Sequence, residues 1–273
     1  MDGQIIAVYC LNVDMLRAVG HRDDSQCHLT DAEVMTIALV AALFFGGNYA
    51  LTCYFLHEQG YMRRMLSASR FNRRLHRVKE LFLTLFAFLG EHWKDLNSES
   101  VYLIDSFPIA SCDNIRIKRS RRYQGEAYRG YIASKRRYFY GLRLHLVVTA
   151  MGEPVEFFLT PGADSDTGAL QWYQFDVPAG SKIIGDKAFN VYAIEDDLAS
   201  IGIALCPLRK KNSKRAIPPW ETYLRELYRK YIETAGSMIT QRFPKKIHAV
   251  TAAGFELKLV LFLLAHSFDC LAR

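Results

Sequence analysis

The spacing of apolar residues changes near residue 97, and this change limits the folds that are open to the chain. Up to about residue 95, apolar residues recur at the three- and four-residue steps of amphipathic helices. From residue 101 onward, short β-prone runs alternate with helical stretches. That alternation predicts a mixed sheet with helices packed on it, which is an α/β layout. We therefore expect a helical N-terminal module over residues 1–97 and an α/β domain over residues 98–273.

The helical module contains clear start and stop signals. Thr30 and Glu33 form a capping box, which predicts the start of a helix, and Gly46 and Gly47 predict its end. Further along, one long amphipathic helix is predicted from apolar residues at alternating steps of four and three. These residues are Phe71, Leu75, Val78, Phe82, Leu85 and Leu89.

Basic residues cluster on the first turns of this predicted long helix. They are Arg70, Arg73, Arg74 and Arg77. One interpretation is a helix end that lies on a phosphate backbone. The other is a charged face that is simply solvated.

Two short apolar runs lead directly into an aspartate. Val101 to Ile104 precede Asp105, and Ile183–Gly185 precede Asp186. Strands disfavour aspartate, and a buried carboxylate costs free energy unless a metal or a capping hydrogen bond offsets it. Ligands gather at the carboxyl ends of strands in α/β sheets, so the two acids can face one another. The ordinary alternative for Asp186 is a Gly-Asp turn.

The remaining elements of the α/β domain follow from the same patterns. Residues 139–150 and 155–160 flank a turn and predict a hairpin. A third strand is expected at residues 203–208. Helices are expected near residues 166–173, where Asp166 or Thr167 is the cap, and at 191–200, 220–239 and 254–268.

A third acid, Glu233, falls in the helix predicted over residues 220–239. It shares a polar stripe with Arg229, and the apolar stripe consists of Leu224, Leu227, Tyr228, Tyr231 and Ala235. A surface ion pair is the ordinary interpretation, although arginine before glutamate is the less stabilising order. Three carboxylates from two strand ends and a helix also suit Mg²⁺ or Mn²⁺. Two such metals can activate water or a 3′-hydroxyl for attack on a phosphodiester.

Other acids compete for these roles. Asp164 and Asp166 are better explained as turn and helix-cap residues. Glu195, Asp196 and Asp197 are expected in the middle of a helix, on a solvated face.

Basic residues outnumber acidic residues, 35 to 28, and the net charge of +7 favours a polyanionic partner. Many of them lie in a basic insert at about residues 111–138, where aromatic residues that can stack on bases are interleaved. The candidate contacts there are Arg116, Lys118, Arg119, Arg121, Arg122, Tyr123, Arg129, Tyr131, Lys135, Arg136 and Arg137. A second cluster consists of Arg209, Lys210, Lys211, Lys214 and Arg215, and the first four are candidate contacts. The alternative for the insert is a disordered basic loop.

Several classes of protein are disfavoured. The six cysteines form no C-x-x-C motif, which disfavours a zinc site and fits a reducing compartment. No P-loop, dinucleotide fingerprint or G-x-S-x-G motif is present. The sequence shows no signal peptide, and its apolar runs are short for a membrane span. We expect a cytoplasmic protein without a membrane partner.

The chain resembles bacterial insertion-sequence transposases of the DDE type, most closely insertion-sequence family nine-eight-two. The strings that carry the resemblance are residues 29–34, 104–108, 128–131, 140–145, 185–190, 209–215 and 232–237. The resemblance implies a ribonuclease-H-like core. It also implies that Asp105, Asp186 and Glu233 are the catalytic residues and hold two Mg²⁺ or Mn²⁺ ions.

The resemblance further implies the partners. They are the terminal inverted repeats of a transposon and a target DNA, bound by a homodimer at the bacterial nucleoid. Residues 1–97 would bind the ends and assemble the complex, and Lys187 and Arg229 join the candidate DNA contacts. Glu226 and Thr240 stand where related transposases often carry tyrosine and lysine. Lys245 and Lys246 are the candidates to replace that lysine.

Two other functions remain open from the sequence. One is a ribonuclease-H-like nuclease that cuts DNA without joining it. The other is a DNA-binding protein without catalysis, against which the complete set of Asp105, Asp186 and Glu233 argues.

Overall fold

The computed structural model describes residues 1–132, 135–244 and 247–272. Contacts between residues divide the chain into two compact units, one of Met1–Leu89 with Ile239–Arg273 and one of Gly90–Met238. The C-terminal residues therefore group with the N-terminal helices, whereas the sequence suggested one boundary at residue 97. That boundary concerned functional modules and stays a prediction.

The first unit is helical. Its elements are α1 (Asp2–Ala18), α2 (Asp31–Phe44), α3 (Tyr49–Glu58), α4 (Ala68–Arg77), the first part of α5 (Lys79–Leu96), and α9 (Ala252–Leu271). Helix α2 is buried over most of its length and packs against α1 and α9. The capping box predicted at its start is confirmed, because the Glu33 N–H donates to the Thr30 hydroxyl and the Thr30 N–H to the Glu33 carboxylate.

The predicted single helix over residues 71–89 is wrong, because α4 and α5 are separate helices. The break lies at Val78, whose backbone leaves the helical range with φ −90° and ψ 11°. All six apolar residues of the predicted stripe are nevertheless buried. Val78 is itself buried, so the apolar stripe continues through the break between the two helices. The apolar periodicity of the sequence therefore gives no sign of the break.

The described helices were compared by length and apolar character with a membrane span. None of them alone has the length and the apolar character to cross a bilayer, and only the pair of α2 and α3, bent by 109°, meets those two criteria when taken together.

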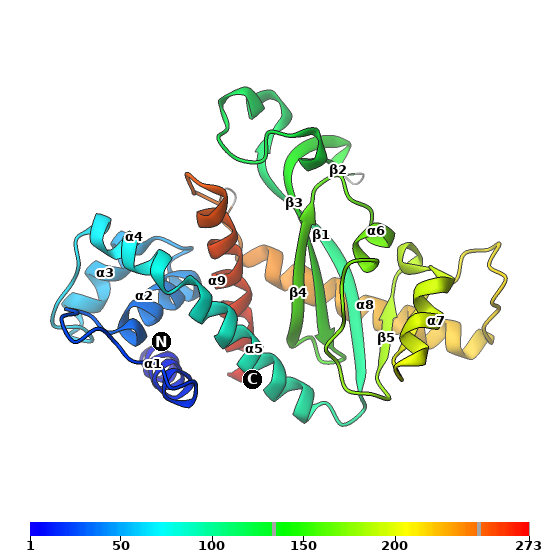
Figure 1. Cartoon of the computed structure of the whole chain (residues 1–273), viewed down its shortest axis with the longest axis horizontal. Coiled ribbons are helices and arrows are strands. Elements are labelled where there is room, and N and C mark those ends of the chain that lie inside the picture. Colours follow the sequence, from blue (N-terminus) through cyan, green and yellow to red (C-terminus); the bar gives the residue numbers. More distant parts are fainter. Residues whose placement is uncertain (133–134, 245–246, 273) are drawn as a thin grey trace. The chain divides into compact units, whose positions relative to one another are not determined.

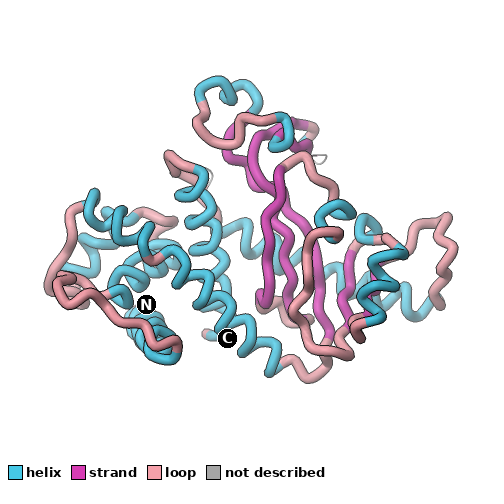
Figure 2. The backbone as a smooth tube through the Cα atoms, viewed as in Figure 1, coloured by secondary structure: helices cyan, strands magenta, loops and turns pink. Residues whose placement is uncertain are grey.

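The second unit is built on one mixed sheet of six strands (Figures 1 and 2). The strands are β1 (Val101–Asp113), β2 (Arg129–Ile132), β3 (Arg137–Thr149), β4 (Pro154–Pro161), β5 (Lys182–Gly185) and β6 (Ala204–Pro207). The main order is β2-β3-β1-β5-β6, with β4 also paired to β3. Strands β1, β5 and β6 are parallel, whereas β3 is antiparallel to β1, β2 and β4. The predicted mixed α/β sheet with flanking helices, preceded in the chain by a helical region, is confirmed.

Most helices of this unit fall where the sequence predicted them. They are α6 (Asp166–Leu170), α7 (Tyr192–Ser200) and α8 (Pro219–Arg242). The predicted cap of α6 is wrong, because the Ser165 hydroxyl accepts the hydrogen bond from the Gly168 N–H. The prediction that β1 ends at Asp105 is also wrong. Its pairing with β3 continues to Asp113, so only the parallel pairing with β5 stops beside Asp105.

Alternate residues of β1 face the two layers of helices that cover the sheet, with α8 behind the strands in Figure 1. Phe107 faces α8, because its ring lies so close to Gly236 that a Cβ built there would overlap it. Ser106 faces the other side, where its hydroxyl donates to Asp166 of α6 at 2.6 Å. Asp105 shares the orientation of Phe107 and therefore looks toward α8.

The buried face of α8 differs from the stripe expected from its apolar residues. Leu224 and Tyr231 are exposed, whereas Arg225 and Ile232 are buried. The Arg225 guanidinium donates to the Pro207 carbonyl at 2.6 Å and pairs with Glu221. The packing face of α8 thus includes a buried arginine, and the positions of the apolar residues alone do not predict this.

The contact between Phe107 and Gly236 gives the first prediction. Gly236→Ala places a methyl group in the Phe107 ring, and overpacking of this kind lowers the free energy of unfolding by about 1–3 kcal/mol. Chemical denaturation measures the change. Gly3→Ala is the matched control, because it adds the same methyl group to a helix in open space. Equal stability of Gly236→Ala and the parent would contradict the packing described.

Candidate active site

The parallel register of β1 and β5 brings two acids side by side. The last paired residues are Ile104 and Gly185, and the next residue on each strand is Asp105 or Asp186. Parallel strands end at the same edge of a sheet, so both carboxylates lie at the carboxyl edge of the sheet. The structure thus brings together the first two members of the predicted set.

Glu233 joins them from α8. It precedes Gly236 by one helical turn, and Gly236 packs on Phe107, two residues beyond Asp105. Arg229 contacts two of the acids, since its Nη2 lies 2.9 Å from a Glu233 oxygen and its Nε 3.8 Å from an Asp186 oxygen. The Arg229–Glu233 pair is therefore more than a surface pair along one helix, because it reaches a strand end as well.

Asp105 is the most perturbed carboxyl group of the site. Burial raises the pKa of Asp105 to about 7, and the carboxylates of Asp166, Asp186 and Glu233 act in the same direction. The hydrogen bond that Asp105 accepts from the Ser106 N–H at 2.8 Å opposes this rise in the pKa. A perturbed acid among other acids is typical of functional sites.

Asp166 is the residue that the sequence interpretation missed. It was explained as a helix-cap residue, but Ser165 takes that role. Asp166 instead accepts from Ser106 at 2.6 Å and lies 3.4 Å from an Arg143 nitrogen. Arg143 also donates to the Ser106 hydroxyl at 3.0 Å. This network supports β1 from the face opposite to Asp105. The only sequence signal for it was the position of Asp166 at the start of a helix after β4.

The donor set at this edge fits a hard divalent cation. It offers carboxylate oxygens only, which are the ligands that such cations prefer. Burial first, and then the neighbouring carboxylates, raise the pKa of Asp105, and a bound cation would offset both effects. Arg229 supplies the positive charge shared by Asp186 and Glu233 here. Within the described residues, three ligand atoms lie within 4.8 Å of one another only at His21, Asp23 and Asp31 in the helical unit. There Arg74 and His21 already pair with Asp31.

The basic insert is ordered over its described residues, because it contains two 3₁₀ turns, Asn114–Arg119 and Glu126–Tyr128, followed by β2. Most predicted contacts in it are exposed. They are Arg116, Lys118, Arg119, Arg121, Arg129, Tyr131, Lys135, Arg136 and Arg137. Arg122 and Tyr123 are buried instead, each 8% exposed. These two side chains therefore do not present a surface for DNA.

The other predicted contacts differ in what they already bind. Lys187, in the turn just after Asp186, is exposed, as are Lys210, Lys211 and Lys214. Arg209 is mostly buried and pairs with Glu195 at 2.6 Å. The expectation that Glu195 lies on a solvated face is wrong, because its side chain is only 6% exposed.

Two further sets complete the predicted contacts. In the helical unit, Arg70, Arg73 and Arg77 of α4 are exposed, whereas Arg74 is half-buried against Asp31. Lys245 and Lys246 lie outside the described residues.

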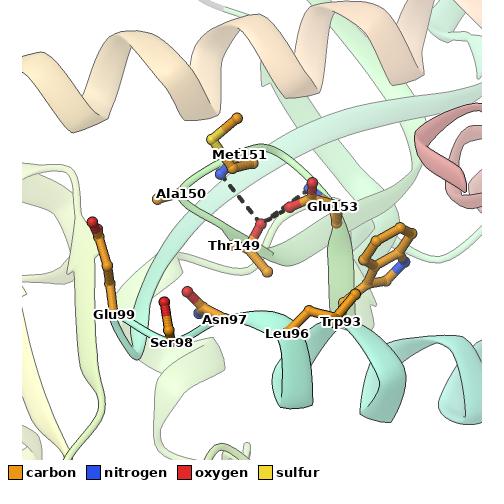
Figure 3. A pocket seen from close by; sticks show the side chains of 9 residues that line it. All are labelled: Trp93, Leu96, Asn97, Ser98, Glu99, Thr149, Ala150, Met151 and Glu153. Carbon is orange, nitrogen blue, oxygen red and sulfur yellow. Dashed lines mark hydrogen bonds between the residues drawn. The ribbon is translucent and has the colours of Figure 1, made fainter. Parts of the chain in front are cut away.

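A pocket of about 320 Å³ lies at the other end of the sheet, between the end of α5 and the β3–β4 turn (Figure 3). Its charged lining residues are Glu99 and Glu153, and the Thr149 hydroxyl donates to Glu153. No lysine or arginine lines it, and we therefore do not assign it to a polyanionic ligand.

The family model described as a transposase DDE domain matches residues 96–243, which is more than half of the chain and includes all three acids. No curated protein matches the sequence. A cryo-EM structure of the piggyBac transposase synaptic complex with hairpin DNA is similar at 9% identity and a TM-score of 0.42. That match covers 95% of this chain and 70% of the other.

His145 of β3 lies in the sheet on the same face as Ser106 and is fully buried. Its ring stacks on Phe158 at 4.4 Å, and its Nε2 lies 3.1 Å from the Thr160 hydroxyl. Burial lowers the pKa of His145 to about 4, and the nearby Arg143 acts in the same direction while Asp166 opposes it. The folded protein therefore holds this imidazole neutral.

The lowered pKa of His145 predicts a pH dependence of stability. The unfolded chain binds a proton near pH 6.5, whereas the folded chain does so only near pH 4. The stabilisation is therefore complete above pH 6.5 and falls by up to about 3 kcal/mol as the pH drops through that window. Denaturation of the parent and of His145→Gln between pH 4 and 7 measures it. Parallel pH curves for the two proteins would show that His145 does not titrate as described.

Proposed function

Because this chain belongs to the DDE transposase family, we propose that it cuts DNA at the ends of a transposable element and joins the freed 3′-hydroxyl to target DNA. Both steps are displacements at phosphorus. Water is the nucleophile in the first, and the 3′-hydroxyl is the nucleophile in the second. We also propose that the element is a bacterial insertion sequence of family nine-eight-two and that the protein acts at the nucleoid, on the strength of the sequence strings described above.

The observation that carries this proposal is the convergence of Asp105, Asp186 and Glu233 at one edge of the sheet. These residues would hold two Mg²⁺ or Mn²⁺ ions, which supply Lewis acidity toward the attacked phosphate when bound. Arg229 orients Asp186 and Glu233 through its guanidinium. The contact between Phe107 and Gly236 sets how closely α8 packs on β1, and therefore where Glu233, one turn before Gly236, lies relative to Asp105.

Replacement of the acids tests the proposed catalytic role. Asp105→Ala or Asp186→Ala is expected to abolish DNA cleavage with Mg²⁺ and to leave DNA affinity within about twofold, because affinity comes from basic groups. Gel assays of nicked product and fluorescence anisotropy measure the two quantities. Asp197→Ala, which removes an exposed acid from α7, is the matched control and should cleave normally. Cleavage by either active-site variant would remove that residue from the site.

A strand-transfer assay separates the proposal from its two alternatives. Joined products support transposition. Nicks without joining support a ribonuclease-H-like nuclease, and a gel shift without either product supports a DNA-binding protein that lacks catalysis.

We propose DNA as the partner of the exposed basic residues of the insert, with their cations on the phosphate backbone. Substitution of Arg116, Arg119, Arg121 and Arg136 by glutamine should weaken binding to all sequences. The dependence of log affinity on log salt should also flatten by about 0.9 per lost phosphate contact. Lysine at the same four positions is the control, since it keeps the charge. An unchanged salt slope in the glutamine variant would mean that the insert does not touch DNA.

We further propose that residues 1–97 bind the element ends and that the chain acts as a homodimer, because transposition requires two ends to be cut and joined together. Light scattering of the protein with end DNA should give two chains per complex that holds two ends. One chain on one end throughout the reaction would contradict the dimer.

A further inference from the structure

The loop that follows β6 emerges at the same edge of the sheet as the acids. Pro207 pairs with Gly185, and the Leu208 N–H donates to the Gly185 carbonyl at 3.0 Å. The loop from Arg209 to Arg215 therefore begins beside Asp186. It carries five basic residues in seven positions, and these divide into two kinds by what they contact.

Both arginines are held by one buried carboxylate. Arg209 donates to the two oxygens of Glu195 at 2.6 and 2.9 Å. Arg215, at the other end of the loop, donates to the same carboxylate at 3.1 Å and to the neighbouring Asp196 at 2.7 Å. Arg209 also donates to Asn190 at 3.0 Å, in the segment that follows Asp186. Glu195 thus closes the base of the loop and ties it to the active-site edge.

Tyr192 holds the loop from within. Its hydroxyl accepts from the Lys214 N–H at 2.8 Å and lies 2.8 Å from the Ser213 hydroxyl. The Arg215 guanidinium lies over its ring at 4.7 Å. The shape of the loop is therefore set by contacts to α7, without help from a ligand.

The three lysines of the loop, Lys210, Lys211 and Lys214, are exposed. Among the described residues, no carboxylate lies within ion-pair distance of them. Charge-assisted contacts to a phosphate backbone are stronger when the cations need not be ordered on binding. The three lysine ammonium groups meet that condition, because the loop that carries them is already held in place. The loop also lies next to the acids proposed to act on a phosphodiester.

We propose that the 209–215 loop is a preformed grip for the phosphodiester backbone of the DNA strand at the acid site. Lys210, Lys211 and Lys214 contact the phosphates. Arg209 and Arg215 are positioning residues that do not touch DNA, and Glu195 is the anchor of both. This inference rests on the proposed function, because it takes DNA as the substrate of the neighbouring acids.

Substitution of Glu195 separates anchoring from bulk charge, because the two predict changes of opposite sign. Glu195→Gln removes a negative charge, so bulk electrostatics alone predicts tighter DNA binding. Loss of the anchor predicts binding roughly tenfold weaker, because the lysines must then be ordered on the DNA. Asp197→Asn removes the same charge two residues away on an exposed position and should bind as tightly as the parent or more tightly.

Two further variants keep the test sound. Tyr192→Phe changes no charge and removes the hydroxyl that holds Ser213 and Lys214, so it should weaken binding in the same direction if Glu195→Gln fails to fold. Glutamine at Lys210, Lys211 and Lys214 together should lower the salt slope by roughly two to three units. In Glu195→Gln the three lysines should still contact phosphates once the DNA is bound. The dependence of affinity on salt should therefore stay close to that of the parent.

The measurements are anisotropy titrations of a labelled duplex without divalent metal at several salt concentrations, and trypsin digestion without DNA. Trypsin should cut Glu195→Gln after Lys210, Lys211 or Lys214 faster than it cuts the parent or Asp197→Asn. Equal or tighter DNA binding by Glu195→Gln and Tyr192→Phe, or an unchanged salt slope in the lysine variant, would overturn the grip. These measurements do not depend on DNA cleavage. A protein that shows the expected binding changes but does not cleave DNA would therefore refute the catalytic proposal and leave the grip intact. Active protein with unaffected loop variants would refute only the grip.

Discussion

The parallel pairing of β1 with β5 is the constraint on which the candidate site depends. It fixes Ile104 opposite Gly185, and the two following aspartates have no freedom to lie elsewhere than beside one another. The arrangement is costly, because burial and the neighbouring carboxylates raise the pKa of Asp105 to about 7. A sheet that places acids in this way is poorly explained by stability alone, and a cation bound at this edge would offset the cost.

Arginine serves mainly as a positioning residue around this edge. Arg143 supports β1 through Ser106 and Asp166, Arg229 joins Asp186 to Glu233, and Arg209 joins a loop to α7 through Glu195. A planar guanidinium presents several donors in one fixed fork, whereas an ammonium group is a point charge on a flexible stem. The lysines near the site are exposed, so charge in this unit divides between cations that hold the fold and cations that face solvent.

Local patterns predicted the parts of the fold that local physics decides. The capping box at Thr30 and the apolar runs before Asp105 and Asp186 each act within a few residues, and the structure places helices and strands there. The break at Val78 was missed because a buried valine keeps the apolar period intact. Asp166 and Glu195 were misjudged and Arg225 was overlooked for another reason, since each has a partner that lies 14 to 60 residues away in the sequence. A single sequence does not show which charged residue finds a distant partner and becomes buried.

The strand direction also sets an electrical asymmetry in the second unit. The basic insert leaves β1, Lys187 follows β5 and the lysine-bearing loop follows β6, all at the carboxyl ends of these strands. The opposite end holds the pocket whose charged residues are Glu99 and Glu153 (Figure 3). Exposed cations of the unit therefore gather beyond the carboxyl ends of these strands. A polyanion that comes within about one Debye length, roughly 8 Å at physiological salt, experiences a torque as well as an attraction. Cations gathered at one end of the strands would orient such a polyanion during its approach, before any side chain touches it.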